Sequence, residues 1–148
     1  MKNAHAIISD HVFRGRTSGH VNSVSKLIYG AKFYNDDKAF NALVKLCTGD
    51  IVAKSFDALV SVNTKDSKYN LPHRLAGAIA QKLGISYYNA LSDKNSKCST
   101  RVLKKRILLF DDVIYTGKTM NKASASILKA GAKSVTCFAI ARSKSLDI

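Results

Sequence analysis

The stretch that decides the fold is Arg106-Ile-Leu-Leu-Phe-Asp-Asp-Val-Ile-Tyr-Thr-Gly-Lys-Thr119. Its first part, Ile107 to Phe110, is a short apolar run of the kind that forms a strand buried on both faces. Two adjacent acids follow the run, and a Thr-Gly-Lys-Thr turn then opens a predicted helix. Ligands bind at the carboxyl ends of the strands in an open parallel sheet. The stretch therefore predicts a strand, a polar site at its end and a helix.

The residue types at this site indicate its chemistry. Asp111 and Asp112 suit sugar hydroxyls or a magnesium ion. The turn from Thr116 to Thr119 would offer backbone N–H groups and hydroxyls at a helix N-terminus, where the helix dipole favours an anion such as phosphate. A ribose phosphate would satisfy both parts. A P-loop is excluded because it needs a glycine where Asp112 stands; the remaining structural alternative is that the two acids only cap a helix.

This stretch resembles the phosphoribosyl pyrophosphate (PRPP) motif of type I phosphoribosyltransferases. That motif consists of an apolar strand, Asp-Asp or Glu-Asp, three residues, Thr-Gly, one residue and Thr, and every position is filled here. Residues 112–120 are also similar to the corresponding stretch of hypoxanthine-guanine phosphoribosyltransferases.

A longer part of the chain, about residues 22–142, resembles ComF-like phosphoribosyltransferases. The similar segments are residues 25–36, 56–62 and 68–84. The chain lacks the cysteine-rich zinc module that usually precedes the domain in that group. Its pyrophosphate loop is also shorter, with Ser67-Lys-Tyr-Asn70 in place of Arg-Gly-Phe-Asn. The segment before the PRPP motif is short as well, so the landmarks that would identify an acceptor base are missing.

Helical and strand patterns alternate along the chain, which predicts an α/β fold with an open, mainly parallel sheet flanked by helices. The resemblance implies that this is the type I phosphoribosyltransferase fold. We expect one domain over residues 1–148, with an irregular or strand-like lead-in over residues 1–20 and a mobile basic loop over residues 89–105. Helices are expected at about 21–34, 36–52, 70–84 and 118–130, and strands at 57–62, 85–88 and 134–141 besides the strand of the motif.

The resemblance also implies roles for individual residues. Asp111 and Asp112 would bind the ribose hydroxyls of PRPP, directly or through Mg²⁺, and would favour the positive charge that develops on the sugar as pyrophosphate leaves. The 5′-phosphate would be bound by Tyr115, Thr116, Gly117, Lys118 and Thr119. The expected pyrophosphate loop contributes Asn63, Thr64, Lys65 and Lys68, although the two lysines are equally well explained as solvated surface residues.

Tyr115 bears on the choice of acceptor. The matching position in purine-salvage relatives is an Asp suited to act on a base nitrogen. A tyrosine phenol titrates near ~10 and is no carboxylate base at neutral pH. Tyr115 would instead stack on a base or pack beside the loop, which argues against a purine-salvage mechanism.

The net charge of +14 on 16.1 kDa predicts affinity for anions, among them PRPP, pyrophosphate, DNA and RNA. Basic residues are concentrated between Lys94 and Arg106, and among them Lys97, Arg101, Lys104 and Lys105 would close over the ligand or bind nucleic acid. No apolar run reaches the ~18 residues that a membrane span needs, and no signal peptide is evident, so a cytoplasmic location is expected. Neither the three cysteines nor the four histidines have the spacing of a metal site.

Two functions follow from these features. The first is a magnesium-dependent phosphoribosyltransferase that transfers ribose 5-phosphate from PRPP to an acceptor and releases pyrophosphate. The second is a catalytically reduced module that senses PRPP or a nucleotide and binds DNA or RNA as a regulator or effector. The sequence names neither the acceptor nor the macromolecular partner, and it leaves open a homodimer or a larger complex.

Overall fold

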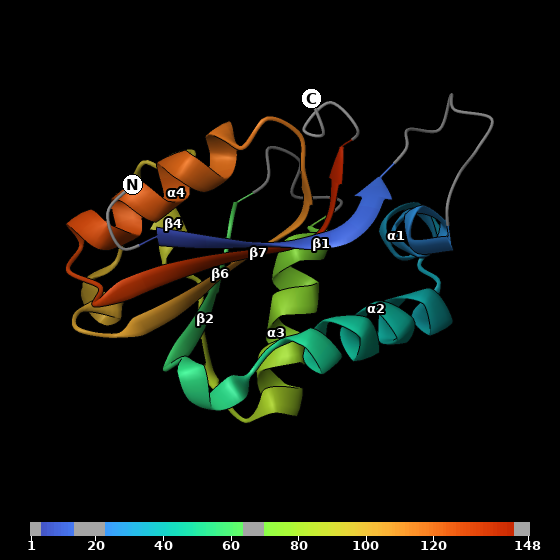
Figure 1. The fold of residues 1–148 in the computed structure, drawn as a ribbon, viewed down its shortest axis with the longest axis horizontal. Coiled ribbons are helices and arrows are strands. Elements are labelled where there is room, and N and C mark those ends of the chain that lie inside the picture. Colours follow the sequence, from blue (N-terminus) through green and yellow to red (C-terminus); the bar gives the residue numbers. More distant parts are fainter. Residues whose placement is uncertain (1–3, 14–22, 64–69, 144–148) are drawn as a thin grey trace.

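The strand of the PRPP-like motif, β6 (Arg106–Ile114), lies at the centre of the sheet in the computed structural model (Figure 1). The sheet has five strands in the order β1-β7-β6-β2-β3, and every neighbouring pair is parallel. The structure describes residues 4–13, 23–63 and 70–143. The expected α/β fold with a parallel sheet flanked by helices is therefore confirmed.

The remaining elements follow one another along the chain with short connections. They are β1 (Ala4–Phe13), α1 (Ser23–Phe33), α2 (Asp37–Asp50), β2 (Ala58–Ser61), α3 (Leu71–Leu83), β3 (Ser86–Tyr88), β4 (Leu91–Ser92), β5 (Lys97–Cys98), α4 (Lys118–Lys129) and β7 (Ser134–Ser143), with short 3₁₀ helices at Ala53–Ser55 and Thr100–Val102.

Side chains on β6 alternate between two cores, one on each face of the sheet. Leu108 and Phe110 pack in a core built with α1, α2 and α3. Ile107 and Leu109 pack on the other face with α4 and the segment from Ala90 to Val102. Figure 1 shows α4 on one side of the strands and α2 and α3 on the other. Because β6 is buried on both faces, its sequence is a continuous apolar run rather than an alternating one.

The order of the strands sets the place of the site. From β2 the chain crosses through α3 to β3, and from β6 it crosses through α4 to β7, so the two crossovers lead away from each other. The pair β2 and β6 is therefore the topological switch point of the sheet. A crevice opens at such a point beyond the carboxyl ends of the strands.

Local sequence signals explain where the helices begin and end. Asp36 caps α2, its Oδ1 accepting a hydrogen bond from the Ala39 N–H at 3.1 Å. Pro72 lies in the first turn of α3, where a missing N–H costs nothing, and Gly84 ends this helix with φ +71°. Gly131 follows α4 with φ +99°. The expected helices and strands are thus observed within a few residues of their predicted limits.

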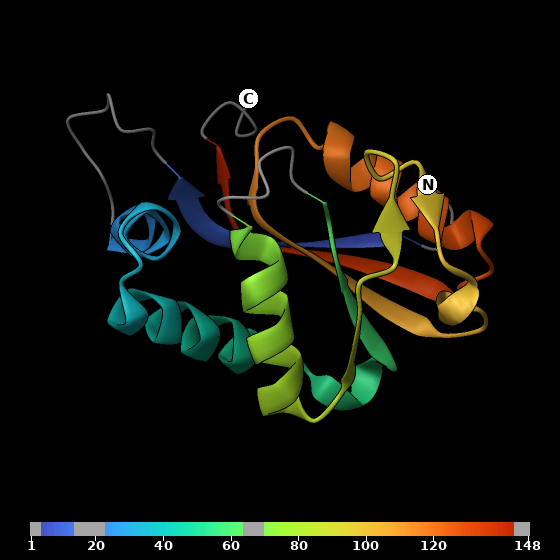
Figure 2. The same ribbon diagram turned by 180° about the vertical axis from the view of Figure 1, so that it is seen from behind.

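The segment 89–105 differs from the irregular loop that we expected. It contains the antiparallel hairpin β4-β5 and a 3₁₀ helix (Figure 2). Strands of two residues are too short for periodicity to reveal them. A buried hydrogen bond, from Ser126 Oγ in α4 to the Asn95 carbonyl at 2.7 Å, attaches the tip of the hairpin to the domain.

The lead-in expected over residues 1–20 is strand-like in its described part, since β1 pairs with β7 along the edge of the sheet. Its residues 14–20, like Thr64, Lys65 and Lys68 of the expected pyrophosphate loop, lie outside the described residues. Among the helices that the structure describes, none is both long and apolar enough to cross a bilayer.

Candidate active site

The two aspartates of the motif lie within β6 rather than beyond its end. Asp111 pairs with Ala139 of β7, and the pairing continues to Ile114 opposite Arg142. The strand is longer than its apolar run because β7 supplies a partner at each of these positions. Asp111 and Asp112 are only 9% and 6% exposed. The two acids lie in a strand and therefore do not cap a helix, and carboxylates this deeply buried are costly without a partner.

Each aspartate uses one oxygen to accept a hydrogen bond from the next backbone N–H. Asp111 Oδ1 accepts from Asp112 N–H at 2.8 Å, and Asp112 Oδ1 accepts from Val113 N–H at 2.7 Å. Burial raises the pKa of Asp111 well above its ordinary value, and the neighbouring Asp112 carboxylate raises it further. A cation bound beside the pair would favour the ionised form.

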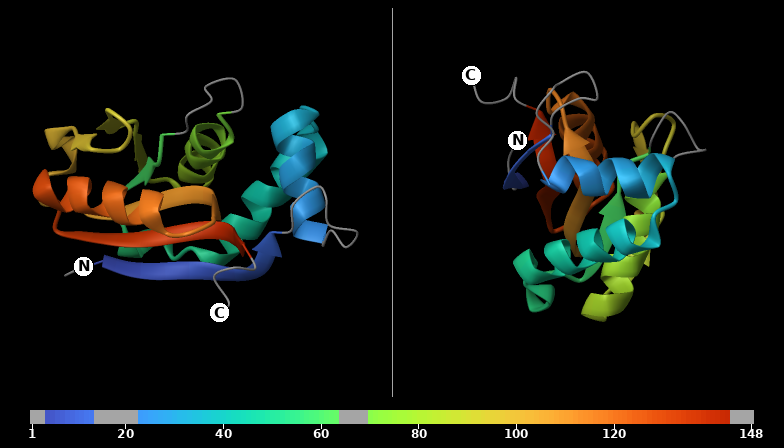
Figure 3. Two further views of the ribbon diagram at one scale, coloured as in Figure 1. Left: turned by 90° about the horizontal axis from the view of Figure 1, so that it is seen from above. Right: turned by 90° about the vertical axis from the view of Figure 1, so that its right-hand side faces the viewer.

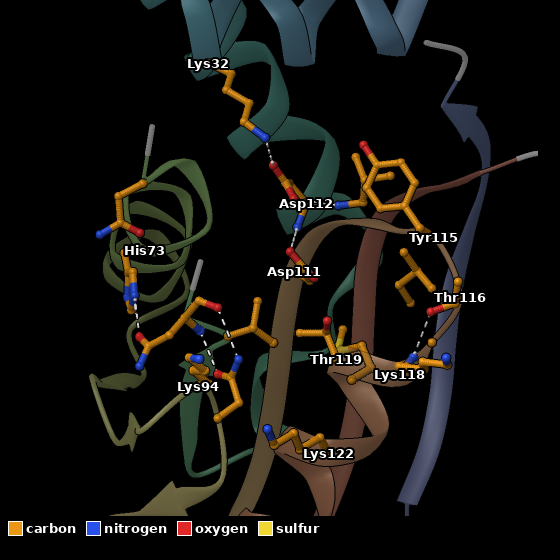
Figure 4. A pocket seen from close by; sticks show the side chains of 18 of the residues that line it. Lys32, His73, Lys94, Asp111, Asp112, Tyr115, Thr116, Lys118, Thr119 and Lys122 are labelled. Atoms are coloured by element: carbon orange, nitrogen blue, oxygen red, sulfur yellow. Dashed lines mark hydrogen bonds and ion pairs between the residues drawn. The ribbon is translucent and has the colours of Figure 1, made fainter. Parts of the chain in front are cut away.

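Asp112 Oδ2 is buried and accepts no hydrogen bond among the described residues. Its partner is Lys32 of α1, whose Nζ lies 3.9 Å away, at ion-pair distance but beyond hydrogen-bond distance (Figure 4). Lys32 is half-buried, and its ammonium also lies 5.7 Å from the centroid of the Phe33 ring. Helix α1 thus brings a positive charge to the carboxylates from a part of the chain about 80 residues away.

The turn after β6 has the geometry expected of an anion site. Gly117 has φ +82°, a left-handed conformation that other residues adopt at a cost of roughly 1–2 kcal/mol. This conformation allows α4 to begin directly at Lys118. The Lys118 N–H donates to Thr116 Oγ1 at 3.3 Å. The exposed Thr116, Lys118 and Thr119 therefore surround the positive end of the α4 dipole.

Tyr115 projects from the start of this turn and is 54% exposed. Its pKa is raised by partial burial and by the carboxylates of Asp112 and Asp111, so it is a neutral phenol at physiological pH. A neutral phenol does not serve as a carboxylate-type general base.

All of these groups line one cavity of about 1110 Å³. One wall is the motif, from Asp111 to Met120, and the opposite wall comes from the ends of β2 and α3 and from the β4-β5 hairpin (Figure 4). The lining includes Lys32, Lys94, Lys118 and Lys122. Four lysines and two carboxylates give the cavity a positive balance, which suits a ligand with several phosphate charges.

Asn63, the described member of the expected pyrophosphate loop, has its polar groups occupied within the protein. Its backbone N–H donates to Asn95 Oδ1 at 2.8 Å, and its carbonyl accepts from Asn95 Nδ2 at 3.1 Å. Its side-chain amide donates to the Leu91 carbonyl, while its Oδ1 accepts from His73. Asn63 therefore anchors the loop to the hairpin and to α3.

His73 belongs to a polar cluster behind this anchor. Its Nε2 lies 2.8 Å from Asn63 Oδ1, and its Nδ1 lies 2.7 Å from Ser61 Oγ and 2.6 Å from the Tyr87 hydroxyl. Because Asn63 Oδ1 is an acceptor, a neutral His73 carries its proton on Nε2 and accepts at Nδ1. The cluster joins the ends of β2, α3 and β3, and its histidine supports the cavity wall.

The His73 cluster predicts a pH dependence of stability. Burial lowers the pKa of His73 in the folded protein, so the unfolded chain takes up this proton first as the pH falls. The stabilisation is complete above the unfolded pKa of ~6.5 and is lost as the pH falls through the folded pKa. The melting temperature of the wild type should drop more between pH 7 and pH 5 than that of H73Q. Parallel curves for the two proteins would show that His73 contributes no such linkage.

The hairpin presents Lys94 to the cavity on an unusual backbone. Asp93, Lys94 and Asn95 are consecutive non-glycine residues with φ of +49°, +54° and +66°. Asn95 is 5% exposed, and its contacts to Asn63 and Ser126 hold the conformation. Such strain persists only where surrounding contacts over-determine it, and it is common beside ligands.

Sequence reasoning did not assign Lys32, His73, Lys94, Asn95 or Lys122 to the site. These residues come from α1, α3, the hairpin and the second turn of α4, and only the tertiary fold brings them together. One signal was present for Lys32, because it lies in the segment 25–36 that resembles the ComF-like group.

The chain matches no protein-family model and no curated protein. It is similar to solved structures of a phosphoribosylpyrophosphate synthetase, of a phosphoribosyltransferase and of a PRPP amidotransferase. Phosphoribosylpyrophosphate synthetase from Mycobacterium smegmatis is 25% identical with a TM-score of 0.52, over 66% of this chain and 33% of the synthetase. Orotate phosphoribosyltransferase from Aeropyrum pernix is 19% identical with a TM-score of 0.54, over 81% of this chain and 64% of that enzyme.

The glutamine PRPP amidotransferase of B. subtilis gives a TM-score of 0.58 at 17% identity, over 83% of this chain and 32% of the amidotransferase. This chain thus spans about a third of the length of the synthetase and of the amidotransferase. Similarity at these levels of identity concerns the backbone. The chain has the phosphoribosyltransferase fold.

Proposed function

We propose that this protein is a phosphoribosyltransferase, which binds PRPP with Mg²⁺ and transfers ribose 5-phosphate to an acceptor with release of pyrophosphate. One observation carries the proposal. The buried carboxylates Asp111 and Asp112 and the turn from Thr116 to Thr119 line the same positively balanced cavity at the switch point of the sheet. A sugar bearing a phosphate presents hydroxyls to the two carboxylates and an anion to the turn.

In this proposal the aspartates hold the 2′- and 3′-hydroxyls of the ribose. As the bond between C1 and the pyrophosphate oxygen breaks, its electron pair leaves with pyrophosphate, and the acceptor forms the new bond to C1. Positive charge builds on the sugar during this step. Fixed carboxylates next to that charge stabilise it without the reorganisation that water would need. The 5′-phosphate meets the N–H groups at the start of α4, with Lys118 beside it.

The carboxylate pair fits a magnesium site completed by the substrate. Asp112 Oδ2 is buried without a hydrogen bond, which leaves it able to bind a cation. No group of three His, Cys, Asp or Glu side chains gathers in the parts of the chain that the structure describes. Mg²⁺ commonly uses one or two carboxylates together with phosphate oxygens, so two are enough. When bound, the ion would neutralise charge on the departing pyrophosphate.

Lys32 is positioned to act in the same site, and its variants test the proposal. The pocket-facing ammonium would move from Asp112 to the phosphates of PRPP once a ribose and a metal occupy the carboxylates. K32M should therefore weaken PRPP binding, by roughly tenfold for one lost charge-assisted contact. K32R should retain most of the affinity. Calorimetric titration would compare the variants, and equal affinity for K32M and the wild type would remove Lys32 from the site.

Membership of the ComF-like group stays a prediction. The acceptor is not named by the sequence, but Tyr115 bears on its chemistry. The neutral phenol of Tyr115 supports an acceptor that needs no carboxylate base at this position. Its exposed ring suits an aromatic acceptor through stacking. A screen of nucleobases and nucleotides for pyrophosphate release from PRPP would identify the acceptor.

The ion pair between Lys32 and Asp112 favours a second candidate, a module that senses PRPP or a nucleotide without turnover. A protein cation already lies where a catalytic metal or sugar would approach. The net charge of +14 agrees with a further role on DNA or RNA. Saturable PRPP binding without pyrophosphate release across the acceptor screen would support this candidate over the enzyme.

A further inference from the structure

Two turns at the N-terminal ends of the strands carry a cluster of positive charge. Segments 100–106 and 129–134 contain Arg101, Lys104, Lys105, Arg106, Lys129 and Lys133, and neither segment contains an acid. We call Arg101, Lys104, Lys105, Lys129 and Lys133 the basic edge. Four of these residues are exposed, and Lys105 is half-buried.

Backbone hydrogen bonds hold the two turns against each other. The Lys104 N–H donates to the Gly131 carbonyl, and the Lys133 N–H donates to the Lys105 carbonyl, each at 2.8 Å. Lys104 has φ +60°, a conformation that these contacts fix. The lysines of one turn therefore lie beside those of the other, although about 28 residues separate them in the sequence.

The carboxylate that contacts this region is already engaged. Asp57 binds Arg106 through a side-chain ion pair at 3.0 Å, and it also accepts from the Arg106 backbone N–H at 2.7 Å. These hydrogen bonds lower the pKa of Asp57 to about 2. Asp57 thus balances Arg106 and also attracts Lys105, which is nearby. Among the described residues, the other four members of the basic edge form no ion pair with a carboxylate. Like charges gathered on one surface repel one another, and a bound polyanion would relieve that repulsion.

The basic edge and the cavity lie at opposite ends of the sheet. The basic edge is at the N-terminal ends of β6 and β7, whereas the cavity is beyond their carboxyl ends. Figure 3 shows the end of α4 and the turn before β6 at one end of the molecule, and α1 at the other. A ligand bound to the basic edge would leave the cavity open.

We propose that the basic edge binds the phosphate backbone of duplex nucleic acid. The C-terminal dipole of α4 accounts for Lys129, but it does not account for Lys104 and Lys105, which lie outside any helix. Single strands are bound through aromatic rings on which bases stack. Here the Tyr88 ring is covered by the Arg101 guanidinium, 4.6 Å from its centroid. Positive charge beside an aromatic ring that is already covered suits a duplex read through its phosphates.

Fluorescence anisotropy with a labelled duplex of mixed sequence, measured over a series of salt concentrations, tests this proposal. The variant K104A/K133A should reduce the slope of log affinity against log salt by about 2, one for each phosphate contact. Affinity near 0.1 M salt should fall more than about tenfold. Two variants with the same loss of charge serve as controls: K38A/K45A on the exposed surface of α2, and K118A/K122A in the cavity. Both should change the affinity far less.

Three results would overturn the proposal. Equal losses in all three double variants would mean that diffuse charge, and no particular surface, binds the duplex. A loss confined to K118A/K122A would move the binding to the cavity. No duplex binding by the wild type at low salt would remove the interaction altogether. Melting temperatures of the variants would establish that each one is folded, since all four lysines of the test and surface-control variants are exposed and none lies in a strand.

Discussion

The double variant D111N/D112N should lose pyrophosphate release from PRPP. Loss of one preorganised electrostatic contact commonly lowers kcat by about 10²–10³-fold, so removal of both charges should reduce turnover at least this much. Asparagine preserves the size of each side chain and keeps one acceptor oxygen for the backbone N–H that Oδ1 accepts now. The variant therefore tests the charge of the pair rather than the shape of the site. Pyrophosphate release at saturating PRPP and Mg²⁺ is the measurement.

The variant D36N/D37N is the matched control, because it makes the same change at an exposed Asp-Asp pair that begins α2. Asparagine caps a helix about as well as aspartate, so this control should remain folded and active. D111N/D112N should unfold close to the wild-type temperature, because burial disfavours the ionised Asp111 carboxylate in the free protein and its removal offsets the lost ion pair between Asp112 and Lys32. If D111N/D112N lost both pyrophosphate release and stability, the result would contradict a role of the two aspartates in the reaction itself.

Among the variants proposed here, F110A should show the largest loss of stability. Phe110 is fully buried at the centre of β6, and its ring stacks on that of Phe138 with centroids 6.0 Å apart. Removal of a buried phenyl ring typically costs about 3–5 kcal/mol in the free energy of unfolding, part of it through the cavity left behind. This is a large fraction of the ~5–15 kcal/mol that stabilises a typical domain. Urea unfolding would measure the change.

Two further variants show whether burial is the cause. Y34A removes an aromatic ring that is 73% exposed, and it should change the free energy of unfolding by less than about 0.5 kcal/mol. F110L retains most of the apolar volume and should cost less than F110A. If Y34A were as destabilising as F110A, the central position of β6 in the core would be wrong.

The sequence predicted the fold because its local signals agree with the tertiary structure. The buried strand before Asp111 is apolar, Asp36 caps a helix, and Gly84 and Gly131 end two others. The PRPP-like motif predicted that two acids and an anion-binding turn would adjoin a single strand and helix. Such features are encoded within a few residues of one another and are readable without the fold.

The part of the site that lies opposite the motif, which comes from α1, the end of β2 and the hairpin, was not predictable in this way. The approach of Lys32 to Asp112 depends on how α1 packs across the end of the sheet. The exchange of hydrogen bonds between Asn63 and Asn95 joins residues 32 positions apart. The hairpin around Lys94 was hidden because its strands have two residues each. These features depend on long-range contacts, which a single sequence does not display.

Calorimetric titration of the wild-type protein with PRPP in the presence of Mg²⁺, beside D111N/D112N, tests the central claim most directly. We expect saturable binding by the wild type and by D36N/D37N, and none by D111N/D112N. Absence of binding by the folded wild-type protein would contradict the account, because the carboxylate pair and the turn would then have no ribose phosphate to hold.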